Sequence, residues 1–266
     1  MRAISSVLYQ TFLDYEIIVV DDGSTDETKA AITQLASHIT YVPNIHNLGV
    51  SASRNIGVRK SRSQLIAFLD SDDYWLPGKL AVQVDFFERY PDALICQTEE
   101  IWIRKGRRVN PKKYHLKPTG NIFGPSLRRC FISPSAVMLK RSLFDEIGMF
   151  DEGLPACEDY DMWLRITCRH PVYLIKQYHV VKEGGNTDQL SYRYKGMDRF
   201  RIKAIVKLIK SGILTENQLK DAVKELSFKC KIYGNGCIKR GKKKEGEYYL
   251  TLPKTINKEL SACYAF

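Results

Sequence analysis

Long apolar runs are missing from this chain of 266 residues, and no segment approaches the roughly 18 apolar residues that a membrane-spanning helix needs. The seven cysteines are odd in number and include no C-x-x-C pair, and most of them lie inside apolar segments. A disulfide framework and a zinc site are therefore disfavoured, and a reducing cytoplasm is the expected location. Basic residues are not interleaved with aromatic ones as in RNA-binding modules, so no nucleic-acid partner is expected.

Charge is distributed unevenly along the chain. Residues 186–266 contain 18 Lys and Arg against 8 Asp and Glu, so this span carries almost all of the net charge of +11. A solvated helical face is the simplest explanation of such a basic region. The alternative is a peripheral contact with the anionic inner face of a membrane.

Strand and helix patterns alternate along the first part of the chain. The β-branched run at residues 16–20 predicts a buried strand, and the apolar run at residues 65–69 predicts another. Helical patterns lie between them at residues 51–60 and after them at residues 79–89. This alternation predicts an α/β fold with a Rossmann-like, mostly parallel sheet flanked by helices.

Helical periodicity dominates the end of the chain. Apolar residues recur at helical spacing from residue 197 onward, and the basic turn at residues 239–244 predicts a helical hairpin. We therefore divide the chain into an α/β domain, residues 1–195, and a basic helical region, residues 196–266. The first pattern, at residues 4–10, is the end of a helix that should follow a strand, so we expect a domain whose first strand is absent from this sequence.

Three carboxylates stand directly after the apolar run at residues 65–69. Asp70, Asp72 and Asp73 would lie at the carboxyl end of a parallel strand, where α/β folds bind ligands. An Asp-x-Asp pair there offers hard oxygen ligands for Mg²⁺ or Mn²⁺, and such an ion often clamps a phosphate or diphosphate. A turn with solvated acidic side chains and no ion is the competing interpretation of this segment alone.

Two further groups of residues carry candidate chemistry. Asp21 and Asp22 follow the first predicted strand and could accept hydrogen bonds from a base or a ribose. Arg54 lies in a glycine-containing segment between the acidic groups and can pair with phosphate. Glu158 and Asp159 open a predicted helix, where they either stabilise its N-terminus or supply a general base beside an acceptor hydroxyl.

Five segments together resemble the family 2 glycosyltransferases of GT-A fold, over about residues 1–200. These segments are residues 16–26, 47–57, 68–75, 148–152 and 158–161. The resemblance implies an inverting, metal-dependent transfer of a sugar from a nucleotide-diphosphate donor, most simply a UDP-sugar, to a glycan or lipid-linked acceptor. It implies that Asp22 contacts the nucleotide and that Asp70 lies near the ribose or the sugar. It also implies that Asp72 ligates a divalent cation, Mn²⁺ or Mg²⁺, and that Asp159 is the catalytic base. Glu158 is expected to bind substrate, together with Asp21, Asp22, Arg54 and Asp70.

Two departures from that family leave other functions open. The family's first strand, with its nucleotide-contacting segment, is absent, and Asn186 stands where many relatives place His. The chain could therefore be a non-catalytic remnant that binds a nucleotide sugar. A nucleotidyltransferase would also use a strand-end acid pair and a metal, but Glu158 and Asp159 have no obvious role there, and no glycine-rich phosphate loop opens the chain.

Overall fold

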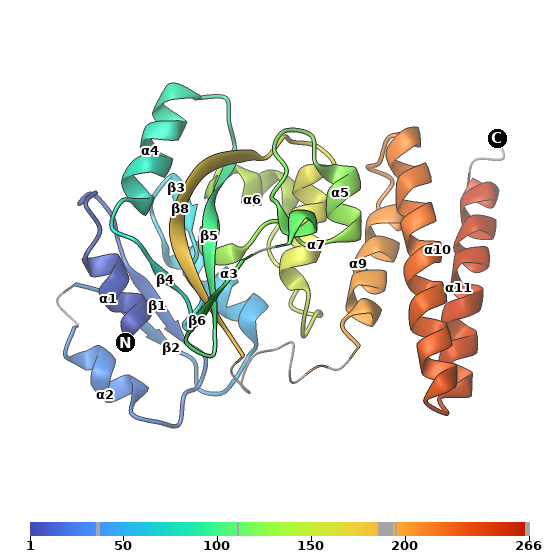
Figure 1. The fold of residues 1–266 in the computed structure, drawn as a ribbon, viewed down its shortest axis with the longest axis horizontal. Coiled ribbons are helices and arrows are strands. Elements are labelled where there is room, and N and C mark those ends of the chain that lie inside the picture. The colour runs from blue at the N-terminus through green and yellow to red at the C-terminus, as the bar shows by residue number, and fades with distance from the viewer. Residues whose placement is uncertain (36–37, 111, 186–193, 195, 264–266) are drawn as a thin grey trace.

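A computed structural model describes the chain except for residues 36–37, 111, 186–193, 195 and 264–266. Figure 1 shows an α/β body that contains the N-terminus and a row of helices that leads to the C-terminus. Within the described residues, no helix is long and apolar enough to cross a membrane. Asn186, which the sequence singled out, lies outside the described residues.

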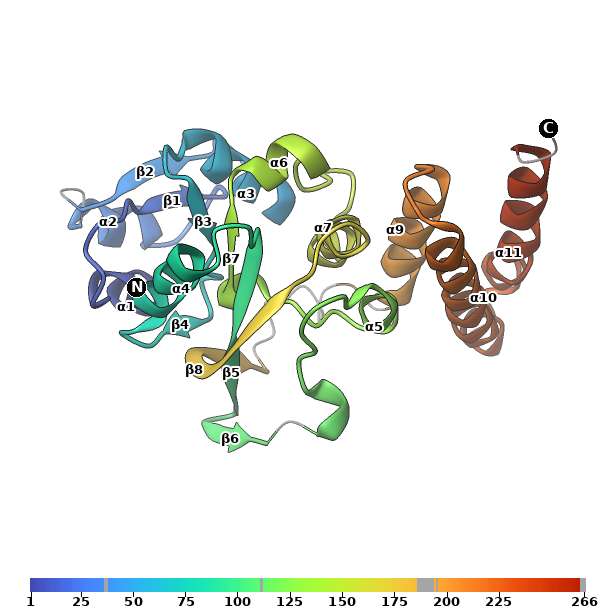
Figure 2. The same ribbon diagram turned by 90° about the horizontal axis from the view of Figure 1, so that it is seen from above.

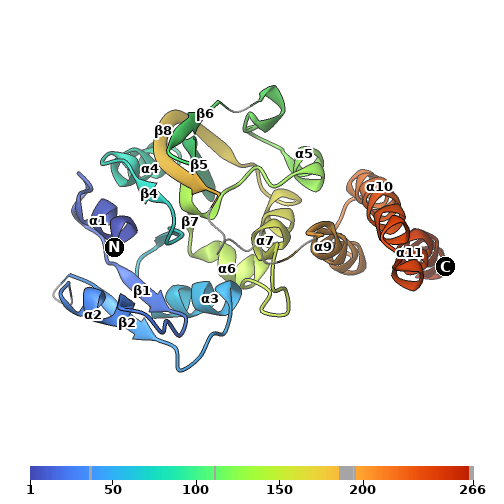
Figure 3. The same ribbon diagram turned by 60° about the horizontal axis from the view of Figure 1, so that its bottom comes forward.

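The first two strands form a small parallel sheet. β1 (Ile18–Asp21) pairs with β2 (Thr40–Pro43), and α2 (Thr28–Thr33) lies between them in the chain. The next helix, α3 (Val50–Lys60), packs against β1. Figure 3 shows this layer as a unit below α1 (Arg2–Leu8). A crossover helix between parallel strands is the connection that the alternating pattern predicted.

The larger sheet has six strands in the described part of the chain. Its main strands run in the order β3, β7, β5, β8, β4, and β6 pairs with β5. The bounds are β3 (Leu65–Ala67), β4 (Tyr74–Trp75), β5 (Ile95–Arg104), β6 (Arg107–Val109), β7 (Val137–Lys140) and β8 (Tyr173–Gly184). The β5–β8 pair is parallel, and the other pairs of this sheet are antiparallel. The α/β fold is thus as predicted, but this sheet is mixed rather than mostly parallel.

One local cause of the mixed sheet is a tight turn. β5 and β6 are joined through Lys105 and Gly106, which both have positive φ, and a two-residue hairpin of this kind connects only antiparallel strands. β1 and β3 also stand in different sheets, because among the described residues β1 pairs with β2 and β3 pairs with β7. The strands that the sequence predicted are present, but their partners are set by contacts distant in sequence.

Two buried apolar clusters hold the helix on which the candidate base lies. One cluster packs α6 (Ser142–Ile147) and α7 (Glu158–Thr167) on the larger sheet and includes Phe150 and Trp163, whose rings meet edge to face. The other joins α7 to α5 (Phe123–Arg128), α9 (Asp198–Lys210) and α10 (Glu216–Lys239). The bounds of the remaining helices are α4 (Lys79–Arg89) and α11 (Lys243–Cys263), with short 3₁₀ turns at η1 (Lys113–His115) and η2 (Pro134–Ala136).

The C-terminal helices form the hairpin that the sequence predicted. Figure 2 shows α7, α9, α10 and α11 side by side, and α10 packs along α11. Thr215 caps α10 in a capping box with Gln218, which satisfies N–H groups that would otherwise lack partners. Because α9 and α10 share an apolar cluster with α7, this helical region braces the helix that carries Glu158 and Asp159.

Lys79, at the start of α4, is a fully buried lysine with 0% of its surface exposed. Its Nζ donates to Gln83 Oε1 at 2.6 Å and lies 4.0 Å from the ring centroid of Trp75. Burial lowers the pKa of Lys79 to about 7 because it disfavours the ammonium form. Above that pH the unfolded chain binds more protons here than the folded chain does, so stability rises with pH up to the ordinary lysine pKa.

We expect Lys79→Met to remove this pH dependence. Between about pH 7.5 and pH 9, the free energy of unfolding in urea should rise by about 1–2 kcal/mol more in the wild type than in the variant. Lys60→Met, at an exposed position of α3, is the matched control and should keep the wild-type slope. Equal slopes for the wild type and Lys79→Met would mean that Lys79 is not the titrating group.

Candidate active site

The turn between β3 and β4 carries the acidic cluster. Asp70, Asp72 and Asp73 each present a carboxylate oxygen, and these oxygens lie within 4.8 Å of one another. Ser135 fixes the turn, because its Oγ accepts the Asp70 N–H at 3.2 Å and donates to Asp73 Oδ2 at 2.6 Å. The sequence selected Asp70 and Asp72 as site residues, and the structure adds Asp73 to the same group.

The oxygens of this cluster fit a divalent cation. Three carboxylates converging on one point form a hard, anionic donor set, which suits Mg²⁺ or Mn²⁺ better than a soft metal. Asp73 is buried, whereas Asp70 and Asp72 are half-buried and so reachable from solvent. The assignment of Asp72 as the metal ligand stays a prediction, and the geometry lets Asp70 and Asp73 join it.

Arg54 joins the acidic cluster to the start of α7. Its Nη2 lies 2.7 Å from Asp70 Oδ1, and its Nη1 lies 2.6 Å from Glu158 Oε1. Only 10% of the Arg54 side chain and 5% of the Glu158 side chain are exposed. Two acidic segments that are far apart in sequence therefore meet at one buried cation. The phosphate contact predicted for Arg54 stays a prediction, since both ends of its guanidinium are engaged by carboxylates here.

These contacts shift the pKa values of the buried groups in different directions. Burial acts to raise the pKa of Asp70, but Arg54 and Lys182 outweigh it and hold the pKa below its usual value. Burial and the neighbouring Asp159 raise the pKa of Glu158, and Arg54 only partly opposes them. Burial also works to lower the pKa of Arg54, yet Asp70 and Glu158 raise it, so the guanidinium stays charged.

Asp159 stands in the first turn of α7. Cys157 has φ 62°, in the left-handed region, and this tight entry starts the helix at Glu158. The helix N-terminus favours the negative charge of both acidic residues. Cys130 Sγ lies 3.5 Å from Asp159 Oδ2, and burial together with Asp159 raises the pKa of the Cys130 thiol, which keeps it neutral. Asp159 itself is half-buried, so a substrate hydroxyl could reach it.

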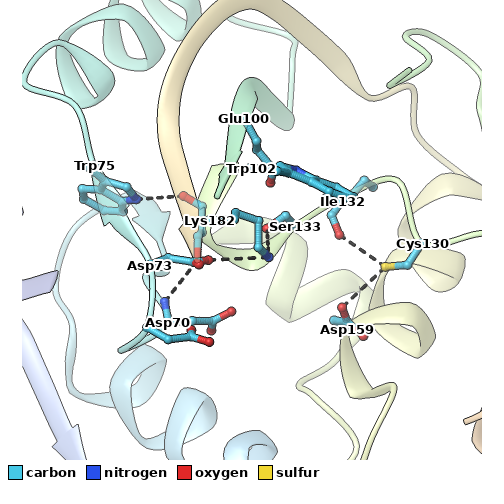
Figure 4. A network of polar contacts seen from close by, with 12 residues as sticks. Asp70, Asp73, Trp75, Glu100, Trp102, Cys130, Ile132, Ser133, Asp159 and Lys182 are labelled. Atoms are coloured by element: carbon cyan, nitrogen blue, oxygen red, sulfur yellow. Dashed lines mark hydrogen bonds and ion pairs between the residues drawn. The ribbon is translucent and has the colours of Figure 1, made fainter. Parts of the chain in front are cut away.

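Lys182 of β8 lies against the acidic cluster. Its Nζ is 2.9 Å from Ser133 Oγ and 3.5 Å from Asp73 Oδ2, and Figure 4 shows both contacts. Strand register explains this position: Tyr74 pairs with Val181, so the residues next to them, Asp73 and Lys182, face one another. Sequence reasoning missed Lys182, because a lysine near the end of a strand carries no local sign of its partner.

Electrostatic interactions connect Lys182 to both acidic groups. Burial opposes the charged form of Lys182, but Glu100, Asp73, Asp70 and Asp159 together raise its pKa. Glu100 also forms a buried ion pair with Lys117 at 3.2 Å. The cation on Lys182 is therefore retained at neutral pH in the middle of the site.

Asp22 holds the loop that leads into α3. Its Oδ1 accepts from Asn44 Nδ2 at 2.9 Å and from the Leu48 N–H at 2.8 Å, and its Oδ2 accepts from the Gly49 N–H at 2.9 Å. Burial acts to raise the pKa of Asp22, but these donors outweigh it and lower the pKa. Gly49 has φ 93°, a conformation that other residues rarely adopt, and it places its N–H on the carboxylate.

Asp21 is buried, and its carboxylate accepts hydrogen bonds from two nearby residues. Its carboxylate accepts from the Ser24 N–H at 2.9 Å and from the Tyr41 hydroxyl at 2.6 Å. The structure thus brings together Asp70, Asp72, Arg54, Glu158 and Asp159 by direct contacts or short electrostatic links. It connects Asp21 and Asp22 to that group through the loop and α3, and their nucleotide contacts stay predictions.

We expect Arg54→Met to destabilise the protein strongly. The change leaves Asp70 and the buried Glu158 without their shared cation, which should cost about 3–5 kcal/mol in the free energy of unfolding near pH 8. The loss should shrink toward pH 5, because Glu158, with its folded-state pKa raised further, then binds a proton and no longer buries a charge.

Urea unfolding of matched variants checks this expectation. Arg59→Met, at an exposed position of the same helix, should change stability little. Adding Glu158→Gln to Arg54→Met should restore part of the lost stability, since it removes the buried charge. A variant Arg54→Met as stable as Arg59→Met would show that the Arg54 bridge does not hold the two acidic segments together.

Comparisons with known proteins identify the family of this chain. The family model described as "Glycosyl transferase family 2" matches residues 1–148. The chain is 30% identical over 197 residues to an uncharacterized glycosyltransferase of Rickettsia felis, a match that covers 71% of this chain and 31% of that protein. The chain therefore spans less than a third of that relative.

Two further comparisons concern a named enzyme and a solved structure. The chain is 32% identical over 171 residues to the UDP-Glc:alpha-D-GlcNAc-diphosphoundecaprenol beta-1,3-glucosyltransferase WfaP of Escherichia coli, covering 61% of this chain and 62% of that protein. The crystal structure of S. aureus TarS 1-349 in complex with UDP-GlcNAc superposes with a TM-score of 0.66 at 16% identity, covering 97% of this chain and 87% of that one. At that identity the likeness concerns the fold, with its helical C-terminal part.

Proposed function

Because this chain belongs to glycosyl transferase family 2, we propose that it transfers a sugar from a nucleoside-diphosphate donor, most simply a UDP-sugar, to a glycan or lipid-linked acceptor. The observation that carries this proposal is the Arg54 bridge, which brings the strand-end acids and the acids of α7 to one place. The relative WfaP supports the donor and acceptor classes, since it is a glucosyltransferase that uses UDP-Glc and a GlcNAc-diphosphoundecaprenol acceptor.

The residues divide into two functional sides. On the donor side, Asp70 would lie near the ribose or the sugar, and Asp21 and Asp22 would shape the loop that faces the nucleotide. Asp72, with Asp70 and Asp73 in reach, would hold a divalent cation, Mn²⁺ or Mg²⁺, which supplies positive charge against the leaving diphosphate when bound.

The acceptor side is built around Asp159. Its carboxylate would take the proton of the acceptor hydroxyl while the oxygen attacks the anomeric carbon, and the bond to the diphosphate oxygen breaks on the opposite face. A single displacement of this kind inverts the anomeric centre. Glu158 would act through Arg54, because its ion pair keeps Asp70 and α7 in register.

A radiolabelled sugar-transfer assay tests the proposal. The chain is incubated with Mn²⁺, a UDP-sugar and a GlcNAc-diphosphate lipid, and free UDP and labelled lipid are measured together. We expect both to appear in equal amounts. Binding of UDP without any transfer would favour the non-catalytic remnant, and incorporation of the nucleotide into product would favour a nucleotidyltransferase.

Peripheral membrane contact belongs to the same proposal. The basic C-terminal helices would lie near an anionic surface when the acceptor is embedded in a bilayer. Binding to vesicles of anionic lipid should then weaken as salt is raised, because screening shortens the reach of surface charge. Vesicle binding that does not respond to salt, or no binding at all, would remove this part of the proposal.

A further inference from the structure

Lys182 occupies the space between the two acidic groups of the site. Figure 4 shows its side chain reaching from β8 toward Asp73, with Asp70 on one side and Asp159 on the other. The Nζ lies 3.5 Å from Asp73 Oδ2, and attraction from Glu100, Asp70 and Asp159 also reaches it. A cation in this position faces both the group that would hold the donor and the group that would receive the acceptor.

Lys182 and Arg54 differ in their exposure and in how far carboxylates occupy their hydrogen-bond donors. Both ends of the Arg54 guanidinium contact carboxylates at 2.6 and 2.7 Å, and only 10% of that side chain is exposed. The Lys182 side chain is 32% exposed. In the described part of the chain, its Nζ lies 2.9 Å from Ser133 Oγ and forms a longer ion pair with Asp73, whereas an ammonium group has three N–H donors.

The site is rich in carboxylates, so an anionic substrate needs a positively charged side chain that it can contact. Besides Glu100, which is paired with Lys117, five carboxylates gather here, namely Asp70, Asp72, Asp73, Glu158 and Asp159. A diphosphate is itself an anion, so it can approach this group only where positive charge is available to it. Arg54 is enclosed by its carboxylate partners, which leaves Lys182 as the more accessible of these two cations.

We propose that Lys182 binds a phosphate oxygen of the donor's diphosphate and stays on it as the diphosphate leaves. The inference rests on the proposed function, and it adds a substrate-binding residue that acts by its own charge rather than through the carboxylates that would hold a metal. Charge-assisted hydrogen bonds from lysine to phosphate are among the stronger polar contacts in proteins. The neighbouring Ser133 and Asp73 would keep the ammonium aimed at the diphosphate between turnovers.

Calorimetric titration with UDP and with uridine separates a phosphate contact from a general structural role. We expect Lys182→Met to weaken UDP binding by about 10- to 100-fold, as the loss of one charged hydrogen bond does. Uridine carries no phosphate, so its affinity should stay within about twofold of the wild-type value. The UDP effect should persist after EDTA treatment, since the contact does not depend on a bound cation.

Matched variants keep the test independent of folding. Lys176→Met makes the same change at an exposed position of the same strand and should leave UDP binding unchanged. Lys182→Arg retains the charge and should retain most of the UDP affinity. If Lys182→Met is unstable, the comparison is made in the Asp73→Asn background, where the buried carboxylate no longer needs a counter-charge, by measuring UDP binding with and without Lys182→Met.

Each outcome decides the matter. Weaker UDP binding with unchanged uridine binding supports the phosphate contact. Equal UDP affinity in the wild type and Lys182→Met, or equal losses for UDP and uridine, overturns it while the proposed function stands. A wild-type chain that binds neither UDP nor uridine contradicts the proposed function itself, and the role of Lys182 falls with it.

Discussion

Asp159→Asn should reduce sugar transfer by about 10²- to 10⁴-fold, the range expected when a general base is removed. An amide has nearly the same shape as a carboxylate but cannot take the proton of the acceptor hydroxyl at neutral pH. The affinity for UDP should change little, because Asp159, in the first turn of α7, is proposed to act on the acceptor and not on the donor. The measurement is initial-rate transfer alongside calorimetric UDP binding.

The control for that variant is Asp145→Asn, at an exposed position of α6. It makes the same chemical change away from the site and should keep the wild-type rate. Full transfer activity in Asp159→Asn would remove Asp159 as the base. A loss of UDP binding as large as the loss of transfer would instead place Asp159 on the donor side.

Asp72→Asn should abolish the effect of Mn²⁺ on UDP binding. In the wild type, Mn²⁺ should tighten UDP binding by about 10- to 100-fold over EDTA, because a cation held by the Asp72 carboxylate would supply positive charge to the diphosphate. An amide oxygen is a neutral and weaker ligand for a hard cation. The variant with Mn²⁺ should therefore bind UDP about as weakly as the wild type does in EDTA.

Asp92→Asn, on the exposed turn after α4, is the matched control and should respond to Mn²⁺ as the wild type does. A wild type that binds UDP equally with Mn²⁺ and with EDTA would contradict metal dependence. An Asp72→Asn variant that still responds fully to Mn²⁺ would show that the ion sits on other ligands, with Asp70 and Asp73 as the nearest alternatives.

Local sequence pattern predicted the elements whose apolar faces are continuous. The helix expected at residues 79–89 is α4 at both ends, and the strand expected at residues 16–20 overlaps β1 (Ile18–Asp21). The long strand β8 (Tyr173–Gly184) has no such continuous face. The middle of β8 is exposed, so no apolar pattern marks this part as a strand. β8 is long because it pairs with β5 along its length, and that pairing contains register shifts.

Local pattern could not predict the antiparallel partners in the larger sheet. β4 has two residues, Tyr74 and Trp75, and it is a strand only because Val180 and Val181 lie beside it. A strand this short has no period of its own. The mixed character of the sheet follows from such pairings distant in sequence, which alternation of strands and helices does not specify.

The acidic residues of the site were predictable because each group follows a recognisable strand or opens a recognisable helix. That Asp70 and Glu158 meet was not predictable from their spacing, since Arg54 joins them across distant segments. Lys182 gave no signal, because its place in the site depends on the register of β8 beside β4. A charged residue inside a strand can therefore belong to a site whose other residues lie on a turn far away in the sequence.

The position of manganese in crystals grown with UDP and Mn²⁺ tests the central claim most directly. Anomalous scattering locates the ion without reference to the protein density. We expect one manganese peak within direct coordination distance of the Asp72 carboxylate, with the diphosphate between the ion and Lys182, and Asp159 across the space left for the sugar. Manganese and UDP bound on another face, away from the turn between β3 and β4, would contradict it.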